Sequence, residues 1–140
     1  ESLMEAVTTA CYRGVRVELY VSEKSDQPLV GHAQASYYSE LLKAGVHMYL
    51  YPYPKVLHSK FAIADGEVAV MGSSNMDMRS FGLNYEISLM VGKGELLNAL
   101  RELTNEYKER SALLTEEQWS TRPLHKQYVD NVARLTSALQ

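Results

Sequence analysis

The sequence predicts an α/β fold in which a mixed β-sheet is flanked by helices. Segments with apolar residues at helical spacing alternate along the chain with segments in which apolar and polar residues alternate as in a strand. Near the N-terminus a predicted helix lies between two predicted strands, which is typical of a parallel crossover. Further on, the dipeptide Asp65-Gly66 separates two strand-like segments and predicts an antiparallel hairpin.

The first half of the chain predicts a helix, a strand, a helix and a strand. Apolar residues recur at helical spacing over residues 3–11, and residues 15–21 then alternate as a strand does. After a turn-rich loop the helical pattern returns over residues 28–44 and stops at a glycine. Residues 46–51 form the next predicted strand, which ends at a proline-containing turn.

The second half predicts the hairpin, one more strand and two helices. Residues 57–64 and 67–75 flank the turn, and residues 85–92 read as the next strand. Two apolar stripes at helical spacing then predict a long helix and a terminal helix. The stripes consist of Leu96, Leu100, Leu103 and Tyr107, and of Leu124, Tyr128, Val132, Leu135 and Leu139.

The turn also predicts which residues of the hairpin face each other. With Asp65-Gly66 as a two-residue turn, polar groups converge on one face and apolar groups form core on the other. A bulge near Gly72 would shift this pairing by one residue. The expected pairs are Ile63 with Val68, Phe61 with Val70, Lys60 with Met71 and His58 with Ser73, with Asn75 just beyond on the polar face.

The convergent polar groups suit the chemistry of a phosphodiester. The imidazole of His58 can attack phosphorus or carry a proton, and its ordinary pKa of about 6.5 allows both roles near neutral pH. The ammonium of Lys60, with hydroxyl and amide donors, can hold the anionic oxygens as charge shifts in the transition state. Lys60 also repels a cation, so a histidine-ligated metal site is the poorer interpretation. We therefore expect no metal and no other cofactor.

The same residues resemble the signature of the phospholipase D superfamily. That signature is His-x-Lys, four residues, Asp, six residues and Gly-Ser-x-Asn, and six specified positions make it a strong signal. The segment that follows, with Asn84 and Glu86, is similar to the one after the second such motif in bacterial cardiolipin synthases, and the resemblance covers nearly the whole chain. The matching residues are His58, Lys60, Asp65, Gly72, Ser73 and Asn75.

The resemblance implies an active site built from two motifs. In the family, one histidine becomes a phosphohistidine that carries the phosphatidyl group, and the other protonates the leaving alcohol and then activates the incoming one. This chain has one motif, since His32, His47 and His125 each lack a lysine two residues later. The resemblance therefore implies a missing half, supplied by an N-terminal part of the same protein or by a second copy.

Site roles follow from the same resemblance. His58 would be the general acid and base, Lys60 and Asn75 would bind phosphate oxygens, and Ser73 would support them. Glu86 would hydrogen-bond the catalytic histidine of the opposite half and fix its tautomer. The alternative for Glu86 is an ordinary solvated carboxylate on a strand.

Three further polar residues have a structural and a functional interpretation. Asp65 belongs to the signature and is grouped with the catalytic residues, but its place in the turn favours a structural role. Asp77 is a candidate helix N-cap, and Arg79 either pairs with it or reaches a lipid phosphate. For both we favour the structural interpretation.

Length and composition set the remaining expectations. The chain has 140 residues, a net charge of −3 and one cysteine, and no apolar run approaches the roughly 20 residues that span a bilayer. We expect a soluble piece of a longer protein, because it opens at Glu1 without a methionine. Residues 1–115 are predicted to form the catalytic half-domain and residues 116–140 an amphipathic tail that packs on it; the alternative for the apolar stripe of this tail is a membrane surface.

The predicted function is transfer of a phosphatidyl group between two phosphatidylglycerols, which forms cardiolipin at the cytoplasmic face of the cell membrane in the full-length protein. The piece alone is expected to be inactive. One alternative is a single-motif phosphodiesterase or endonuclease that acts as a homodimer, and another is an inert binding or assembly module. The weakly acidic charge and the absence of a basic stripe in the sequence argue against nucleic acid as a partner.

Overall fold

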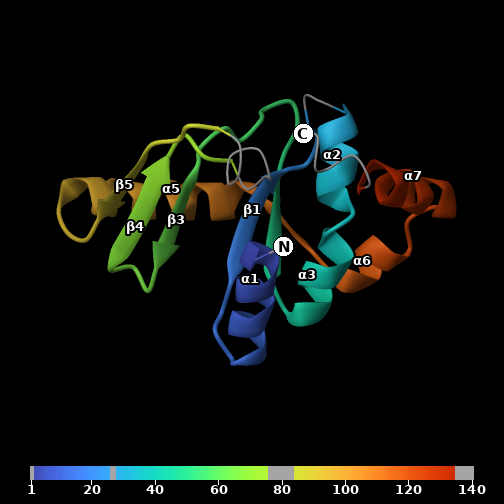
Figure 1. The fold of residues 1–140 in the computed structure, drawn as a ribbon, viewed down its shortest axis with the longest axis horizontal. Coiled ribbons are helices and arrows are strands. Elements are labelled where there is room, and N and C mark those ends of the chain that lie inside the picture. The colour runs from blue at the N-terminus through green and yellow to red at the C-terminus, as the bar shows by residue number, and fades with distance from the viewer. Residues whose placement is uncertain (1, 26–27, 76–83, 135–140) are drawn as a thin grey trace.

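The computed structural model describes residues 2–25, 28–75 and 84–134, in which helices pack around two small sheets (Figure 1). The helices are α1 (Ser2–Tyr12), α2 (Pro28–Ala35), α3 (Tyr38–Ala44), α5 (Glu95–Arg110), α6 (Glu116–Ser120) and α7 (Leu124–Arg134). The strands are β1 (Glu18–Ser22), β2 (His47–Tyr51), β3 (Phe61–Ala64), β4 (Val68–Gly72), β5 (Ser88–Val91) and β6 (Ala112–Leu114). Within these ranges no helix combines the length and the apolar character needed to cross a bilayer.

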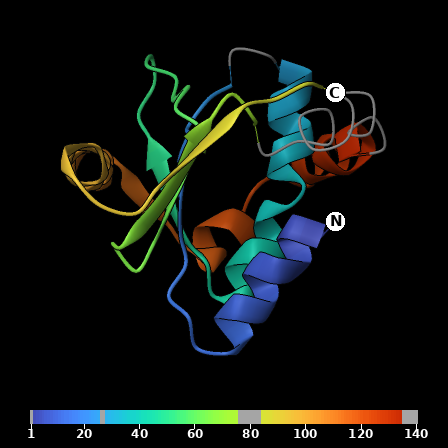
Figure 2. The same ribbon diagram turned by 60° about the vertical axis from the view of Figure 1, so that its left-hand side comes forward.

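The strands form one mixed and one antiparallel sheet. In the first sheet β1 runs parallel to β2, and β6 pairs antiparallel with the other edge of β2. In the second sheet β4 lies between β3 and β5, and both pairs are antiparallel. Helices α1, α2 and α3 lie beside the first sheet and α5 runs behind the second (Figure 1 and Figure 2). The predicted α/β fold is confirmed, with its strands divided between two sheets.

The N-terminal half follows the predicted order, and the parallel β1–β2 pair confirms the crossover. The helix expected over residues 28–44 is divided into α2 and α3. At the break the hydroxyl of Ser36 donates to the carbonyl oxygen of Ala33 at 2.6 Å, a bond that competes with the regular helical ladder. The core of this half centres on Met48 of β2, which is fully buried among residues of β1, α3 and α1.

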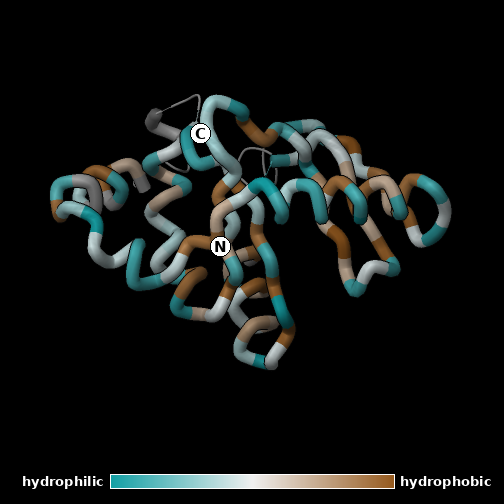
Figure 3. The backbone as a smooth tube through the Cα atoms, turned by 180° about the vertical axis from the view of Figure 1, so that it is seen from behind, coloured by the Kyte–Doolittle hydropathy of each residue, from teal (hydrophilic) through white to brown (hydrophobic). Residues whose placement is uncertain are grey.

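The hairpin between β3 and β4 has a turn one residue longer than predicted. Asp65 and Gly66 adopt left-handed backbone angles, with φ of 54° and 70°, and Glu67 N donates to Ala64 O at 3.0 Å. The first pair of the ladder is nevertheless Ala64 with Val68, so Glu67 is an extra residue on the second strand. Figure 3 shows the hydrophobic strands on either side of this hydrophilic turn.

Because of this extra residue the predicted register is wrong by one residue, and the two faces of β4 are exchanged relative to the prediction. Phe61 lies opposite Met71 and Ile63 opposite Ala69. Because Ala69 is the fully buried residue of β4, whereas Val68 and Val70 are 38% and 39% exposed, the predicted core role of these two valines is wrong. The expected pairs of Lys60 with Met71 and of His58 with Ser73 are wrong for the same reason, since Gly72 N donates to Lys60 O at 3.0 Å.

Helix α5 touches both sheets. Its residues Leu97 and Leu100 are buried against Ala69 and the half-buried face of the β3–β4–β5 sheet. Near its C-terminal end the ring of Tyr107 meets the ring of Tyr51 of β2 edge-on, with a centroid distance of 5.6 Å. The helix thus fixes the second sheet relative to the first.

A charged cluster stabilises the exposed side of the first sheet. The Glu18 carboxylate accepts hydrogen bonds from Lys108 at 2.6 Å, from Tyr20 at 2.7 Å and from Arg16 at 2.9 Å. Partial burial opposes ionisation of Glu18, but these hydrogen bonds, first that of Lys108, outweigh it and lower the pKa of Glu18 to about 2. Tyr20 in turn stacks on Tyr49 of β2, with ring centroids 5.0 Å apart.

The C-terminal segment packs on the helices of the N-terminal half. Helix α6 contacts α3, and α7 contacts α2. Thr115 caps α6 by accepting a hydrogen bond from Gln118 N, and the side chain of Gln118 bonds back to Thr115 N. The last members of the predicted stripe, Leu135 and Leu139, lie outside the described residues, and the division at residue 115 stays a prediction.

Candidate active site

The His-x-Lys pair lies on the segment that leads into β3. Its backbone is held at two points, because Leu57 N donates to Ser22 Oγ at 2.8 Å and Lys60 O accepts the bond from Gly72 N. The side chain of His58 is exposed and that of Lys60 is half-buried. The pair is therefore anchored to the ends of β1 and β4 while the imidazole remains open to a ligand.

Lys60 fixes the orientation of His58. Its ammonium lies 3.1 Å from His58 Nδ1 and donates to the carbonyl oxygen of His58 at 2.7 Å. Because an ammonium can only donate, Nδ1 is the acceptor in this contact, which leaves the hydrogen of the neutral imidazole on Nε2. When the ring takes up a second proton, the resulting imidazolium can give its Nε2 proton to a leaving oxygen and return to the neutral form.

The motif serine, Ser73, connects the end of β4 to the residues just before β5. Ser73 donates to a carboxylate oxygen of Glu86, and Asn84 Nδ2 donates to the other oxygen at 3.3 Å. Ser73 Oγ also accepts from Ile87 N at 3.1 Å. Glu86 is half-buried, and its carboxylate accepts hydrogen bonds from the side chains of both Ser73 and Asn84.

The glycine of the motif permits this close contact between strands. A Cβ atom added to Gly72 would lie 2.2 Å from Ile87 O and 2.9 Å from Ser88 Cα, distances that no side chain tolerates. A glycine is needed here because the backbone of the next strand occupies the space of a side chain. The spacing of the signature thus has a structural reason besides its chemistry.

His58, Lys60 and Ser73 line one open groove of about 480 Å³. Its floor is apolar and includes Phe61 and Met71 from the hairpin, and α5 supplies one wall. The groove also contains residues that sequence reasoning missed, namely Ser59, whose hydroxyl lies 2.8 Å from Tyr107 OH, together with Leu100 and Leu103. Their helical spacing predicted a stripe on α5, but no local signal in the sequence connected that stripe with the motif.

The remaining candidate residues lie elsewhere. Asn75 is exposed and does not line the groove, although it makes an interaction of its own. Asp65 lies in the β3–β4 turn, at the end of β3 away from His58, and seven residues of extended chain span up to roughly 23 Å. Asp77 and Arg79 lie outside the described residues.

The groove combines an imidazole and an ammonium with an apolar floor. Such a set can bind an anionic phosphate beside an alkyl or glyceryl group and can move a proton at the same place. Among the described residues, no three His, Cys, Asp or Glu side chains are grouped as a metal would require.

Comparison with known protein families gives a match over residues 1–109 to the family described as "Cardiolipin synthase, PLD-like domain". The chain belongs to this family. The phospholipase D-like match includes the groove, the hairpin and most of α5, and it ends before β6.

Individual proteins agree with the family. The chain is 37% identical over 139 residues to cardiolipin synthase A of Klebsiella pneumoniae (strain 342), which is 99% of this chain and 28% of that protein. It is 39% identical over 124 residues to cardiolipin synthase A of Yersinia pseudotuberculosis serotype O:1b (strain IP 31758), covering 89% of this chain and 25% of that protein. The chain thus spans about a quarter of the length of these curated relatives.

A solved structure shows the same fold at low sequence identity. Nuc from Salmonella typhimurium, a phospholipase D family member, superposes with a TM-score of 0.63 and 17% identity, over 80% of this chain and 72% of that one. The phospholipase D-like fold predicted from the signature is confirmed.

Proposed function

We propose that this chain supplies one half of a phosphatidyltransferase site that forms cardiolipin from two phosphatidylglycerols. The observation that carries the proposal is the position of His58 and Lys60 in the same groove as the motif serine. The groove offers a proton donor and a fixed positive charge beside an apolar floor, which suits a lipid phosphodiester. The family match and the relatives named cardiolipin synthase A support the reaction class.

The reaction takes place in two displacements. The histidine of the other half attacks phosphorus, a nitrogen–phosphorus bond forms, and the bond from phosphorus to the glycerol oxygen breaks while His58, present as an imidazolium, gives its Nε2 proton to that oxygen and becomes neutral. His58 then accepts the proton of a glycerol hydroxyl on the second phosphatidylglycerol. That oxygen attacks phosphorus and the nitrogen–phosphorus bond breaks, so the products are cardiolipin and free glycerol.

Each motif residue has a place in this scheme. Lys60 holds the phosphate oxygens, and its hydrogen bond to the carbonyl oxygen of His58 holds the backbone of that residue in place. Asn75 contributes a second donor to the phosphate. Ser73 orients Glu86, and Glu86 receives the Nδ1–H of the histidine from the other half, which fixes the tautomer of that nucleophile. Asp65 acts through the turn and not on the substrate.

The other half of the site comes from the part of the protein that the curated relatives contain and this chain lacks. In the intact protein the groove faces lipid at the cytoplasmic surface of the membrane. Residues 1–115 form the catalytic half-domain in this scheme, and residues 116–140 form a tail that joins it.

A chimera tests the proposal directly. We would replace the matching stretch of Klebsiella pneumoniae cardiolipin synthase A with this chain and measure cardiolipin and glycerol formed from phosphatidylglycerol. The chimera should be active, and His58→Ala should lower its rate by at least a factor of roughly 10² to 10⁴. The matched control is His125→Ala, since His125 is exposed and lies outside the groove. A His58→Ala chimera that retains full activity contradicts the proposal.

The isolated chain provides a second test. One imidazole cannot be nucleophile and acid on opposite sides of the same phosphorus, so a monomer should form no cardiolipin. Residual cleavage of a synthetic phosphodiester should require a dimer that brings two copies of His58 together. If the monomer forms cardiolipin and His58→Ala abolishes this activity, the half-site proposal is wrong.

A further inference from the structure

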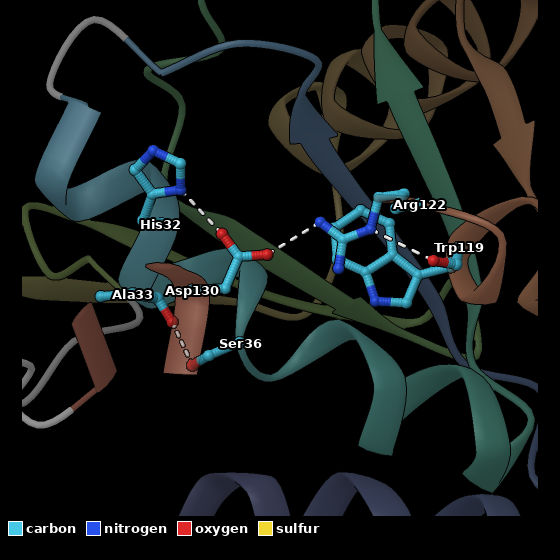
Figure 4. A network of polar contacts seen from close by, with 6 residues as sticks. All are labelled: His32, Ala33, Ser36, Trp119, Arg122 and Asp130. Atoms are coloured by element: carbon cyan, nitrogen blue, oxygen red, sulfur yellow. Dashed lines mark hydrogen bonds and ion pairs between the residues drawn. The ribbon is translucent and has the colours of Figure 1, made fainter. Parts of the chain in front are cut away.

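Helix α7 is held against α2 by a buried carboxylate. Asp130 is 3% exposed, and its two oxygens bond to His32 Nδ1 at 2.7 Å and to an Arg122 nitrogen at 2.8 Å (Figure 4). Among the side chains of α7 whose burial the structure describes, the other buried one is Ala133, which is 3% exposed. The side of α7 that meets the protein is therefore polar or small, which is the reverse of an ordinary amphipathic surface helix.

The partner of the carboxylate is itself fixed. Arg122 Nε donates to Trp119 O at 3.1 Å, and the guanidinium lies 3.0 Å from the centre of the indole ring (Figure 4). Trp119 packs in turn on Tyr38 of α3, with ring centroids 5.0 Å apart. This chain of contacts sets the rotation of α7 about its own axis.

As a consequence, the apolar stripe of α7 points away from the protein. Leu124, Tyr128 and Val132 recur every four residues on one face and are 81%, 71% and 45% exposed, and Val129 beside them is 43% exposed. Sequence periodicity favoured packing of this stripe on the domain, whereas the helix packs through its other side. The helix also lies at the end of the molecule away from the β3–β4–β5 sheet, so the stripe is separate from the groove (Figure 1).

Charge identifies the surface that the stripe fits. Residues 118–140 contain three basic residues and one acidic residue, Asp130, which is buried and paired. The remaining 117 residues contain eleven basic and sixteen acidic residues, so the stretch that contains α7 has a net charge of +2 and the rest of the chain −5; Glu116 and Glu117 of α6, which belong to the predicted tail 116–140, are counted with the rest. A basic helix with an outward apolar stripe complements an anionic lipid surface.

We propose that α7 binds the surface of an anionic bilayer, with Leu124, Tyr128, Val129 and Val132 inserted at the boundary between headgroups and acyl chains. The inference relies on the proposed function only for the presence of a membrane near the enzyme. A second protein copy fits the stripe less well. An eleven-residue helix is roughly 16 Å long and 10 Å wide, and such a face is far smaller than the roughly 800 Å² per partner of a stable interface.

Vesicle binding by the full 140-residue chain tests the proposal. Sucrose-loaded vesicles of equal parts phosphatidylserine and phosphatidylcholine are sedimented with wild type, with Leu124→Ser/Val132→Ser and with the control Tyr12→Ser/Val15→Ser. The control removes two apolar side chains of similar exposure, 75% and 53%, from another surface. We expect the wild type and the control to bind alike, and the stripe variant to bind on the order of tenfold more weakly. Wild-type protein that stays in the supernatant, or a stripe variant that binds as well as wild type, overturns the proposal.

Fluorescence gives a second readout that does not depend on losing affinity. In Tyr128→Trp the new indole should shift its emission to shorter wavelength on addition of the same vesicles, whereas Trp119 is already covered by Arg122 and Tyr38. Unchanged emission overturns the proposal. The proposal is also overturned if the substitutions in the stripe convert a dimer to monomers without changing vesicle binding. Phosphatidylserine is not the proposed substrate, so failure here is distinct from failure of the chimera to form cardiolipin.

Discussion

Ser73 at the end of β4 donates a hydrogen bond to Glu86, thirteen residues later in the chain. The same hydroxyl accepts the backbone N–H of Ile87 at 3.1 Å, so one side chain satisfies both a carboxylate and a strand. In the proposed reaction Glu86 orients the histidine of the other half, and the serine therefore acts on catalysis through the carboxylate and not through the phosphate.

The first prediction concerns this serine. In the active chimera, Ser73→Ala should lower kcat about 10- to 100-fold with little change in KM, because Glu86 loses a partner and Ile87 N loses its acceptor. The matched control is Ser88→Ala on the neighbouring strand, which should retain full activity. A large rise in KM at constant kcat would assign Ser73 to phosphate binding instead.

The second prediction concerns the close approach of β4 and β5. Gly72→Ala places a methyl group 2.2 Å from a backbone oxygen and should destabilise the chain by about 1–3 kcal/mol, as overpacking does. Gly92→Ala is the control, because nothing lies within 4 Å of its added Cβ atom. Urea unfolding of both variants measures the difference. Equal midpoints for the two variants would contradict the strand contact described here.

The third prediction concerns stability in acid. Since the pKa of Glu18 is lowered to about 2 from its ordinary 4.5, the folded state favours the carboxylate. Its contribution is complete above pH 4.5 and is lost as the pH falls toward 2. Glu18→Gln should therefore cost about 1–2 kcal/mol at pH 7, a figure reduced for solvent screening of the cluster.

Thermal unfolding at several pH values checks this prediction. The difference in Tm between wild type and Glu18→Gln should shrink as the pH falls through that window. Glu67→Gln, at an exposed position in the hairpin turn, should show no comparable difference at any pH. A gap between wild type and Glu18→Gln that persists unchanged at the lowest pH would show that the cluster does not act through ionisation.

The fourth prediction concerns metal dependence. Cardiolipin formation by the chimera should continue in EDTA, because Lys60 and the two imidazoles supply the positive charge that a metal ion would otherwise bring to the phosphate. The measurement is the rate of glycerol release before and after chelation. Loss of turnover in EDTA, restored by a divalent ion and not by a monovalent one, would contradict it.

The spacing of the motif predicted the site better than it predicted the sheet around it. His58, Lys60 and Ser73 come together because they lie at the open end of one hairpin, before β3 and after β4, and local chemistry specifies the short turn at its other end. The exact pairing depends on a single extra residue, Glu67, and neither face of the hairpin is apolar enough to exclude the alternative. The signature survives the shift because Gly72 and Ser73 lie at the strand end, where strict alternation no longer applies.

Long-range contacts account for what the sequence did not predict. The β6 strand has three residues and pairs only because it meets the free edge of β2, a partner more than 60 residues earlier. On α5, Leu97 is buried while Leu96 of the predicted stripe is 41% exposed, since the second sheet decides which turn of the helix it covers. The outward orientation of the α7 stripe could not be predicted either. In the sequence Asp130 is expected to face solvent, and only the fold brings His32 and Arg122 beside it.

The position of Tyr107 limits how far this chain can be shortened. The ring of Tyr107 contacts Tyr51 of β2, and its hydroxyl lies within hydrogen-bond distance of Ser59 in the groove. Helix α5, which carries Tyr107, also lines the groove with Leu100 and Leu103. The motif hairpin therefore depends on its contacts with α5, and we do not expect it to keep its structure when transferred to another protein alone. A protease that cleaves within α5 should therefore disrupt the surroundings of the imidazole as much as a cut within the motif itself.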